Sequence, residues 1–371
     1  MKLRRVAGWS ALAITLALVV TASIAYWRSD NACGAPGGLA TPVQPMKAWI
    51  HCDYGSPDVL KLVKVEKPAP ADNEVLIRVR AASVNPLDWH YMRGTPYIMR
   101  TGTGLRRPTV LRLGVDYAGT VEAVGKLVTH FKPGDDVFGG RTGAFAEYVT
   151  VRENGAVAMK PDNMTFEQAA AVGIAGVTAL QGLRDRGKVQ SGQRVLINGA
   201  SGGVGTFAVQ IAKSLGAHVT GVSSTRNVEL VRSIGADTVI DYTKFDYTTG
   251  EQRYDVILDN VGNRALSGNR RVLKANGKYV LIGGGGPEVG KWIGPLIGPI
   301  KAMVMTRFVS QEMGMLLAEL TQRDLTMLRD LMLAGKVTPV IDRRYTFSDV
   351  PAAIRYQETG RARAKVVVTL E

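Results

Sequence analysis

The sequence has few of the side chains that bind metals or form cross-links. Only two cysteines and four histidines occur in 371 residues. Tetrahedral zinc needs three or four converging donors, and the histidines are scattered along the chain at His51, His90, His130 and His218. We therefore expect no metal site. Cys33 and Cys52 are expected to be buried or idle thiols, with a disulfide as the alternative, so they leave the redox compartment undecided.

A nucleic-acid-binding pattern is also lacking. The formal net charge is +14, but the lysines and arginines are dispersed and no basic run is interleaved with aromatic residues. We interpret the charge as attraction to anionic lipid and to a phosphorylated cofactor, and expect no nucleic-acid partner. The hydrophobic content of 46% and the 42 glycines are typical of a globular protein. The length fits two domains plus an accessory segment.

A run without charged side chains extends over residues 6–27, after Lys2, Arg4 and Arg5. About twenty apolar residues can cross a hydrocarbon layer of roughly 30 Å. The run predicts a single-pass membrane anchor over residues 1–28 that contacts membrane lipid; the alternative is a cleaved signal peptide. The basic residues would keep the N-terminus in the cytoplasm and place the folded part on the other side of the membrane. This orientation conflicts with the use of a cofactor from the cytoplasm. Residues 29–45 contain several Gly and Pro residues without periodicity and are expected to be a tether.

A strand, a glycine turn and a helix follow one another in the middle of the chain. The apolar run 194–198 precedes Gly199-Ala-Ser-Gly-Gly-Val-Gly205, an amphipathic stretch over 206–215 and a second strand over 218–222. Such a turn lets backbone N–H groups approach a pyrophosphate at the start of a helix. The pattern predicts a dinucleotide site, with contacts from Ser201, Gly202, Gly203 and Val204.

The choice of nucleotide is read at the end of the second strand. An acidic residue there would bind the ribose 2′-hydroxyl of NAD, but the sequence reads Ser223-Ser-Thr-Arg226. Ser224 and Arg226 suit a 2′-phosphate, so we expect NADPH; the alternative is that Arg226 is a solvated residue at a helix start. Further strands over 254–259 and 278–282 end in turns that offer Asn260, Val261 and Gly283. This repeated order of a strand and then a glycine-containing turn indicates a doubly wound parallel sheet.

Short strands separated by Pro and Gly turns precede and follow the parallel sheet. They are expected over 75–81, 115–124, 136–138 and 146–151, and again over 345–347 and 365–370 after a helix over 350–357. The order predicts an α/β protein whose β-rich, antiparallel, barrel-like domain is split around the sheet. We expect the β-rich domain at 46–173, the cofactor-binding domain at 174–308 and the return to the first domain at 309–371.

Several segments resemble a known family in the correct order. They are Met46-Lys-Ala48, Tyr54-Gly-Ser-Pro-Asp-Val-Leu60, Ser83-Val-Asn-Pro-Leu-Asp88, Gly114-Val-Asp-Tyr-Ala-Gly119 and the turn from Gly199 to Gly205. The chain from about residue 46 onward is similar to the zinc-free quinone oxidoreductase branch of the medium-chain dehydrogenase/reductases, and to its zeta-crystallin-like and reticulon-4-interacting-protein types. The resemblance implies a GroES-like catalytic domain split around a Rossmann domain. It also implies NADPH and a small hydrophobic quinone or α,β-unsaturated carbonyl as substrate.

The resemblance also implies roles for individual residues. Asn85 stands where zinc relatives carry a cysteine and would lie beside the nicotinamide as a hydrogen-bond donor, so it is the first catalytic candidate. Tyr91 and Tyr97 are candidates for closing the pocket or donating a proton, and are otherwise packed aromatics. Further cofactor contacts are implied for Thr178, whose hydroxyl could instead bond within its helix, and for Tyr242, Arg363 and Lys365.

Other functions stay open at this point. An enoyl-thioester reductase or an alcohol dehydrogenase of the same fold is the nearest alternative, and a catalytically silent nucleotide-binding membrane scaffold is a different class. The apolar segment 292–305, with two Gly-Pro pairs, predicts a homodimer interface or a loop that contacts lipid or substrate.

Overall fold

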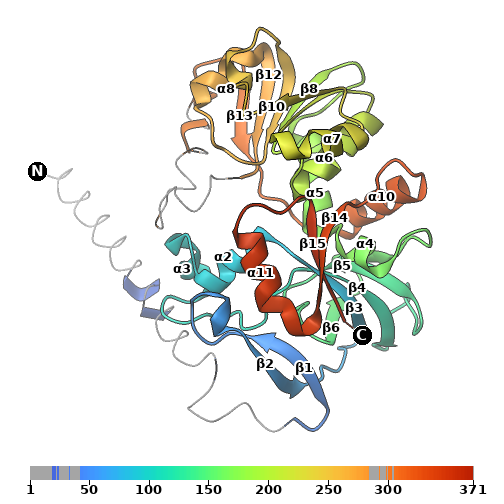
Figure 1. Ribbon diagram of the computed structural model, residues 1–371. Coiled ribbons are helices and arrows are strands. Elements are labelled where there is room, and N and C mark those ends of the chain that lie inside the picture. Colours follow the sequence, from blue (N-terminus) through green and yellow to red (C-terminus); the bar gives the residue numbers. More distant parts are fainter. Residues whose placement is uncertain are drawn as a thin grey trace, which may run out of the picture.

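The computed structural model describes residues 19–21, 23–24, 33, 42–283, 292, 298, 300–302 and 305–370. The chain forms a parallel-sheet unit and a β-rich unit, which occupy the upper and lower parts of Figure 1. Most of the predicted anchor, and most of segment 292–305, lies outside the described residues. Across the part that is described, no helix is both long and apolar enough to span a membrane.

The parallel-sheet unit has six strands in the order β10-β9-β8-β11-β12-β13. Their bounds are β8 Arg194–Asn198, β9 His218–Ser223, β10 Thr238–Asp241, β11 Tyr254–Asp259, β12 Leu273–Leu281 and β13 Glu312–Met315. All neighbouring pairs are parallel. The helices between them are α6 Gly203–Ser214, α7 Val228–Ser233 and α8 Leu266–Val272. The predicted doubly wound sheet is confirmed, because all described neighbours are parallel and the strand order runs outward from β8 in both directions, first to β9 and β10 and then to β11, β12 and β13.

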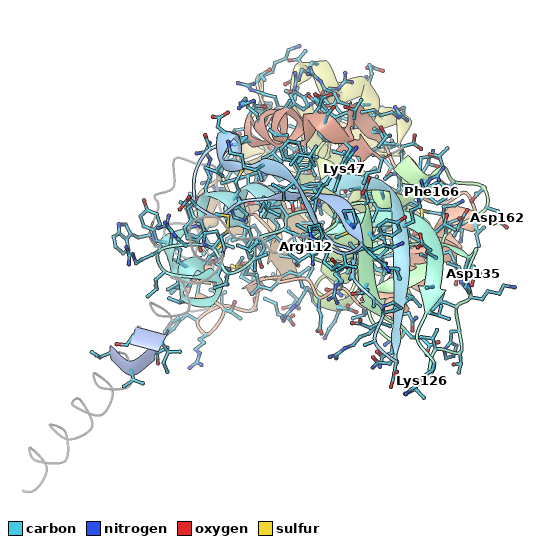
Figure 2. The ribbon with its side chains drawn as sticks, turned by 90° about the horizontal axis from the view of Figure 1, so that it is seen from below. Lys47, Arg112, Lys126, Asp135, Asp162 and Phe166 are labelled. Atoms are coloured by element: carbon cyan, nitrogen blue, oxygen red, sulfur yellow. A yellow bond between two sulfur atoms is a disulfide. The ribbon has the colours of Figure 1, made fainter. Side chains whose placement is uncertain are left out.

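The β-rich unit contains a seven-stranded sheet whose members come from both ends of the chain. The order is β14-β15-β3-β4-β5-β7, and β6 pairs with β3. The strands are β3 Glu74–Val84, β4 Asp116–Val124, β5 Asp136–Gly140, β6 Tyr148–Arg152, β7 Val157–Met159, β14 Ile341–Thr346 and β15 Lys365–Thr369. Their pairing is antiparallel except for β14 with β15. The turn between β4 and β5, which carries Lys126 and Asp135, lies at one end of this sheet (Figure 2).

Smaller elements complete the β-rich unit and connect it to the parallel sheet. β1 Pro45–Ile50 and β2 Lys61–Glu66 form a two-stranded sheet. The helices are α2 Pro86–Arg93, α3 Arg100–Thr103, α4 Phe166–Ala170, α5 Gly173–Gln181, α10 Gln322–Leu333 and α11 Val350–Glu358. The helix α5 is almost wholly buried and packs on α6. A single apolar cluster joins α4 and α5 to β8 and β11, so both units share a core.

Two expectations need correction. β13 lies beyond the boundary expected at residue 308, and it pairs with Val280 and Leu281 of β12, so the parallel sheet extends to Met315. The prediction of two idle thiols is wrong, since Cys33 and Cys52 form a disulfide with a Cα–Cα distance of 5.7 Å. Cys52 lies just after β1, at the start of the folded part, and the Cα atom of Cys33 lies close enough to it for a disulfide.

Candidate active site

The glycine-rich turn after β8 leads directly into α6. Gly199 has φ +76°, a left-handed backbone that favours glycine. A Cβ atom on Gly205 would lie 2.1 Å from the carbonyl oxygen of Gly199, so no larger residue fits there. The helix begins at Gly203, and its first N–H groups therefore lie on this turn. A dinucleotide pyrophosphate fits such a cradle, on which the predicted residues Ser201, Gly202, Gly203 and Val204 lie.

The segment after β9 lies at the carboxyl edge of the parallel sheet. Ser224 caps the short turn 225–227, and the exposed Arg226 donates from Nη2 to the carbonyl oxygen of Arg361 at 2.6 Å. A guanidinium has five N–H donors, so this bond leaves capacity for a phosphate. Tyr242, after β10, is bound through its backbone N–H to the carbonyl oxygen of Ser223 at 3.0 Å, and its side chain is 47% exposed. These predicted contacts thus lie along one edge.

Asn227 is a site residue that the sequence reasoning missed. Its Nδ2 donates to Oγ of Ser201 at 2.9 Å and to Oγ of Ser224 at 3.3 Å. Its Oδ1 is buried without a hydrogen-bond partner among the described residues. A buried acceptor left unpaired costs free energy, and a ligand hydroxyl would satisfy it. The available signal was its position directly after Arg226.

Asn260 and Val261 follow β11, and Gly283 follows β12, at the same edge. A Cβ atom on Gly283 would lie 2.2 Å from the carbonyl oxygen of Asn260, and one on Gly199 would lie 2.8 Å from Cγ2 of Val261. Asn260 donates from Nδ2 to the carbonyl oxygen of Asn198 at 3.0 Å, while its buried Oδ1 has no partner among the described residues. The structure therefore brings these predicted residues to the glycine turn and leaves a second acceptor for a ligand.

The loop before β15 touches the glycine turn. The backbone N–H of Ala364 donates to the carbonyl oxygen of Ser201 at 2.8 Å, and Ala364 forms an isolated bridge with Gly202. Arg363 is exposed beside this contact, and its backbone N–H is bound to Asp342. The predicted C-terminal contact with the cofactor cradle thus has a direct structural counterpart.

A buried polar cluster lies where β15, β3 and β4 meet. Lys365 donates from Nζ to Oδ1 of Asn85 at 2.6 Å, and Asn85 donates from Nδ2 to Oδ2 of Asp116 at 2.9 Å. Asp88, on α2, accepts the backbone N–H groups of Asn85 at 2.7 Å and of Gly114 at 2.9 Å. Burial, and secondarily the charge of Asp116, raise the pKa of Asp88 to about 7. Asp88 therefore changes charge near neutral pH.

Asp116 was quoted in the sequence only as part of a motif, and its importance was missed. It is fully buried at the start of β4 and accepts bonds from Ser83, Asn85 and the backbone N–H of Ile174. Buried carboxylates need such partners. An acid inside the run Gly114-Val-Asp-Tyr-Ala-Gly119, which otherwise reads as a buried strand, was the signal that could have identified it.

The remaining candidates lie in different surroundings. Thr178 is buried on α5, and its hydroxyl donates to the carbonyl oxygen of Ile174 at 2.6 Å, as in the helix-bonding alternative; its oxygen can still accept from a ligand. Tyr91 packs on the core of the β-rich unit. The ring of Tyr97 contacts Trp292 with ring centroids 5.3 Å apart. The described contacts of these two tyrosines therefore do not include the polar cluster.

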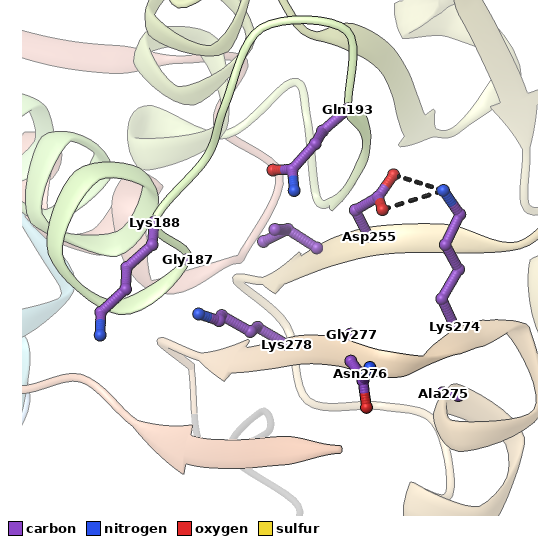
Figure 3. Close-up of a pocket in the computed structure, with 10 residues that line it drawn as sticks. Gly187, Lys188, Gln193, Asp255, Lys274, Ala275, Asn276, Gly277 and Lys278 are labelled. Atoms are coloured by element: carbon purple, nitrogen blue, oxygen red, sulfur yellow. Dashed lines mark hydrogen bonds and ion pairs between the residues drawn. The ribbon is translucent and has the colours of Figure 1, made fainter. Parts of the chain in front are cut away.

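A hollow at the opposite end of the parallel sheet is not part of this site. It lies between Gln193 and Asp255, at the amino ends of β8 and β11 (Figure 3). Lys274 pairs there with both carboxylate oxygens of Asp255, at 2.9 Å each. In open parallel sheets, ligands bind at the carboxyl ends of the strands.

The β-rich unit is split around a parallel sheet, and the dinucleotide cradle of that sheet lies beside a buried polar cluster. This arrangement is typical of a nucleotide-dependent oxidoreductase. A family model described as a zinc-binding dehydrogenase matches residues 234–368, and one described as an alcohol dehydrogenase GroES-like domain matches residues 71–162. A 2-methylene-furan-3-one reductase of Solanum lycopersicum is 37% identical over 87% of this chain and 79% of its own length. The chain belongs to the medium-chain dehydrogenase/reductase superfamily.

Two further relatives are named for the reactions that they catalyse. An NADPH-dependent alkenal/one oxidoreductase of Arabidopsis thaliana is 36% identical over 87% of this chain and 79% of its own length. The structure of a quinone oxidoreductase from Coxiella burnetii superposes with a TM-score of 0.76, at 29% identity, over 88% of this chain and all of that one. The GroES-like and Rossmann architecture expected from the sequence is thereby confirmed.

The zinc named in the family description does not fit the residues present. Within the described ranges no group of three His, Cys, Asp or Glu side chains converges. At the cluster, the ammonium of Lys365 already binds Asn85 and Asp116. A metal cation would have to displace another cation and use an amide as ligand, which the N/S donor preference of zinc disfavours.

Proposed function

We propose that the protein is an NADPH-dependent reductase that transfers hydride to a quinone or to the carbon–carbon double bond of an α,β-unsaturated carbonyl. One observation carries this proposal: the bond between Ala364 and Ser201 holds Lys365, and with it the buried cluster of Asn85 and Asp116, against the glycine turn. A dinucleotide on that turn would extend toward the cluster. The named activities of the furanone, alkenal and quinone reductases support the same reaction class.

NADPH is the cofactor that the edge after β9 favours. Ser224 and Arg226 offer a hydroxyl and a guanidinium where NAD-specific sites place a carboxylate. The nearby Asp241 is bound to the hydroxyls of Thr225 and Thr243, at 2.6 and 2.7 Å, so its charge is already engaged. Arg226 can therefore bind a 2′-phosphate, because the carboxylate of the nearby Asp241 is already bound to these two hydroxyls.

The chemistry requires no metal under this proposal. When bound, NADPH supplies the hydride. The protein has to hold the reacting ring, exclude water and stabilise the oxygen that gains negative charge. Asn85 is the predicted donor to that oxygen. One of its Nδ2 hydrogens is bound to Asp116 at 2.9 Å, and the longer bond to the carbonyl oxygen of Ser83, at 3.3 Å, is the one that a ligand can replace.

A substrate panel with the purified full-length chain tests the proposal. NADPH consumption is followed with enones, quinones, enoyl thioesters and simple ketones, and products are identified by mass spectrometry. We expect turnover of enones or quinones and none of simple ketones. Turnover confined to alcohols and ketones would replace the proposal with an alcohol dehydrogenase. Tight NADPH binding without turnover of any acceptor would identify a catalytically silent nucleotide-binding protein.

The attachment of the protein to a membrane is also a proposal. We infer a single-pass membrane anchor from the charge-free run 6–27, which would keep the enzyme close to hydrophobic quinones or lipid-derived enones.

A homodimer is proposed as well, because β13 is an outer strand of its sheet and offers an unpaired edge among the described strands.

A further inference from the structure

The strand register brings Lys365, Asn85 and Asp116 to one place. Val366 of β15 pairs with Val84 of β3, so Lys365 and Asn85 are the next residues across from each other. Ser83 of β3 pairs with Asp116 of β4. The three polar side chains therefore come from the ends of three adjacent strands, whose positions are set by backbone hydrogen bonds.

The side-chain amide of Asn85 has a defined orientation because its two ends meet opposite partners. Oδ1 accepts from Nζ of Lys365 at 2.6 Å, and Nδ2 donates to Oδ2 of Asp116 at 2.9 Å. An amide can be turned by 180° with little change in shape, so its orientation depends on which neighbour donates and which accepts. Lys365 has no acceptor atom, and a carboxylate has no donor. Lys365 and Asp116 together therefore permit only one orientation of the Asn85 amide.

Asp116 is itself held from a third side. Its Oδ1 accepts the backbone N–H of Ile174 at 2.8 Å, near the start of α5. A Cβ atom on Gly173 would lie 2.1 Å from the same oxygen, so this approach requires glycine. Asp116 therefore has a fixed position from which it accepts the amide of Asn85.

Lys365 connects this cluster to the cofactor cradle. The preceding residue, Ala364, adopts φ +74° and is bound to Ser201 on the glycine turn. A Cβ atom on Gly203 would lie 3.3 Å from Cδ of Lys365, so the lysine stem runs along the turn. The side chain of Lys365 is 2% exposed. A buried ammonium is costly unless it is paired, and Asp116, at 3.3 Å, supplies the opposite charge.

We propose that Lys365 is a positioning residue for the reduction: with Asp116 it fixes the amide of Asn85, and through it the donor presented at the reacting end of the cofactor pocket. This inference rests on the proposed function and assigns Lys365 a role at the amide, distinct from a contact with a cofactor phosphate. Misplacement of a catalytic group by about 1 Å can reduce the rate on the order of a hundredfold. Removal of Lys365 should therefore reduce kcat.

A double-mutant cycle between Lys365→Met and Asn85→Ala tests the proposal. We expect each single variant to lower kcat with the best enone, Lys365→Met on the order of a hundredfold, and the double variant to match Asn85→Ala, because the lysine acts through the amide. The dissociation constant of NADPH, measured by fluorescence, should change less than about threefold. Melting temperatures of the four proteins without cofactor should be non-additive as well.

Matched variants separate this role from a loss of folding. Lys213→Met removes another lysine that pairs with an aspartate, Asp237 at 2.8 Å, on the surface at the end of α6, and should leave kcat unchanged. Lys365→Met combined with Asp116→Asn removes both charges of the ion pair, so Asp116 is not left buried without its cation; it should regain thermal stability but not kcat. Additive effects on kcat, or a large loss of NADPH affinity in Lys365→Met, would overturn the proposal. An inactive wild-type chain would instead refute the proposed function.

Discussion

Nζ of Lys365 lies 2.6 Å from Oδ1 of Asn85, although 280 residues separate them in the chain. The contact joins the last strand of the protein to the end of β3. It also places the polar cluster next to the glycine turn, through the bond between Ala364 and Ser201. The candidate site of this split domain therefore includes the C-terminal strand, and we expect the activity to require both ends of the folded part.

The first prediction concerns nucleotide selectivity. Arg226→Ala should weaken NADPH binding by about 10- to 100-fold, which corresponds to a hydrogen bond to a charged group of about 1.5–3 kcal/mol. NADH affinity should hardly change, since NADH has no 2′-phosphate. Titrations of both nucleotides measure the two constants. Arg232→Ala, which removes an exposed arginine paired with Glu229, is the control. An unchanged ratio would assign the phosphate to another cation.

The second prediction concerns pH and stability. The pKa of Asp88 is raised from 3.8 to about 7 by burial, so the folded state favours its protonated form. The resulting stabilisation is complete below about pH 4 and is lost as the pH rises through about 7. It amounts to at most about 4 kcal/mol, for a shift of about three pKa units. Asp88→Asn should therefore flatten the decline in stability between about pH 4 and pH 7.

Melting temperatures at several pH values measure this effect. The exposed Asp162 (Figure 2) provides the matched control, Asp162→Asn, which should keep the wild-type pH dependence. If Asp88→Asn loses as much stability as the wild type over this range, the buried carboxyl is not the group that titrates.

The third prediction concerns the cysteines. Thiol titration of the unfolded chain should detect no thiol before reduction and two afterwards, because Cys33 and Cys52 are bonded. The chain-entropy model gives about 3 kcal/mol for a loop of this size. The double variant Cys33→Ser with Cys52→Ser should melt at a lower temperature. Two thiols detected without reductant would show that the bond does not form in solution.

Local sequence patterns were sufficient to predict much of the fold. The β-branched run before Gly199 predicted β8, and the apolar run before Asn260 predicted β11, with the bounds that the structure gives. These signals are local, because strand propensity and glycine turns act over a few residues. The glycine cradle could be predicted for the same reason.

The contacts between distant residues could not be predicted in this way. No local pattern indicates that Lys365 meets Asn85 and Asp116, because their contact depends on the order β15-β3-β4 in the sheet. The same applies to the disulfide, whose cysteines are separated by the tether. Asn227 was missed because an asparagine near a helix start is common, and its burial between Ser201 and Ser224 appears only in three dimensions.

The fourth prediction concerns the N-terminal segment. The full-length chain should stay in the membrane fraction through high-salt and alkaline washes, because such washes remove electrostatic attachment but not a buried helix. Deletion of residues 1–28 keeps Cys33 and should release a soluble, active reductase. A native N-terminus near Tyr26 would identify a cleaved signal peptide. Protease accessibility in intact cells would then assign the side, and a disulfide-bonded domain is expected in an oxidising compartment.

The most direct measurement of the central claim is the transfer of label from deuterated NADPH. Each of the two C4-deuterated isomers is incubated with the full-length chain and an enone, and the product is analysed by mass spectrometry and NMR. We predict that one isomer delivers a single deuterium to the β-carbon and the other delivers none, because the pocket presents one face of the nicotinamide to the acceptor. Deuterium on the carbonyl carbon, or a product without label from either isomer, would contradict the account.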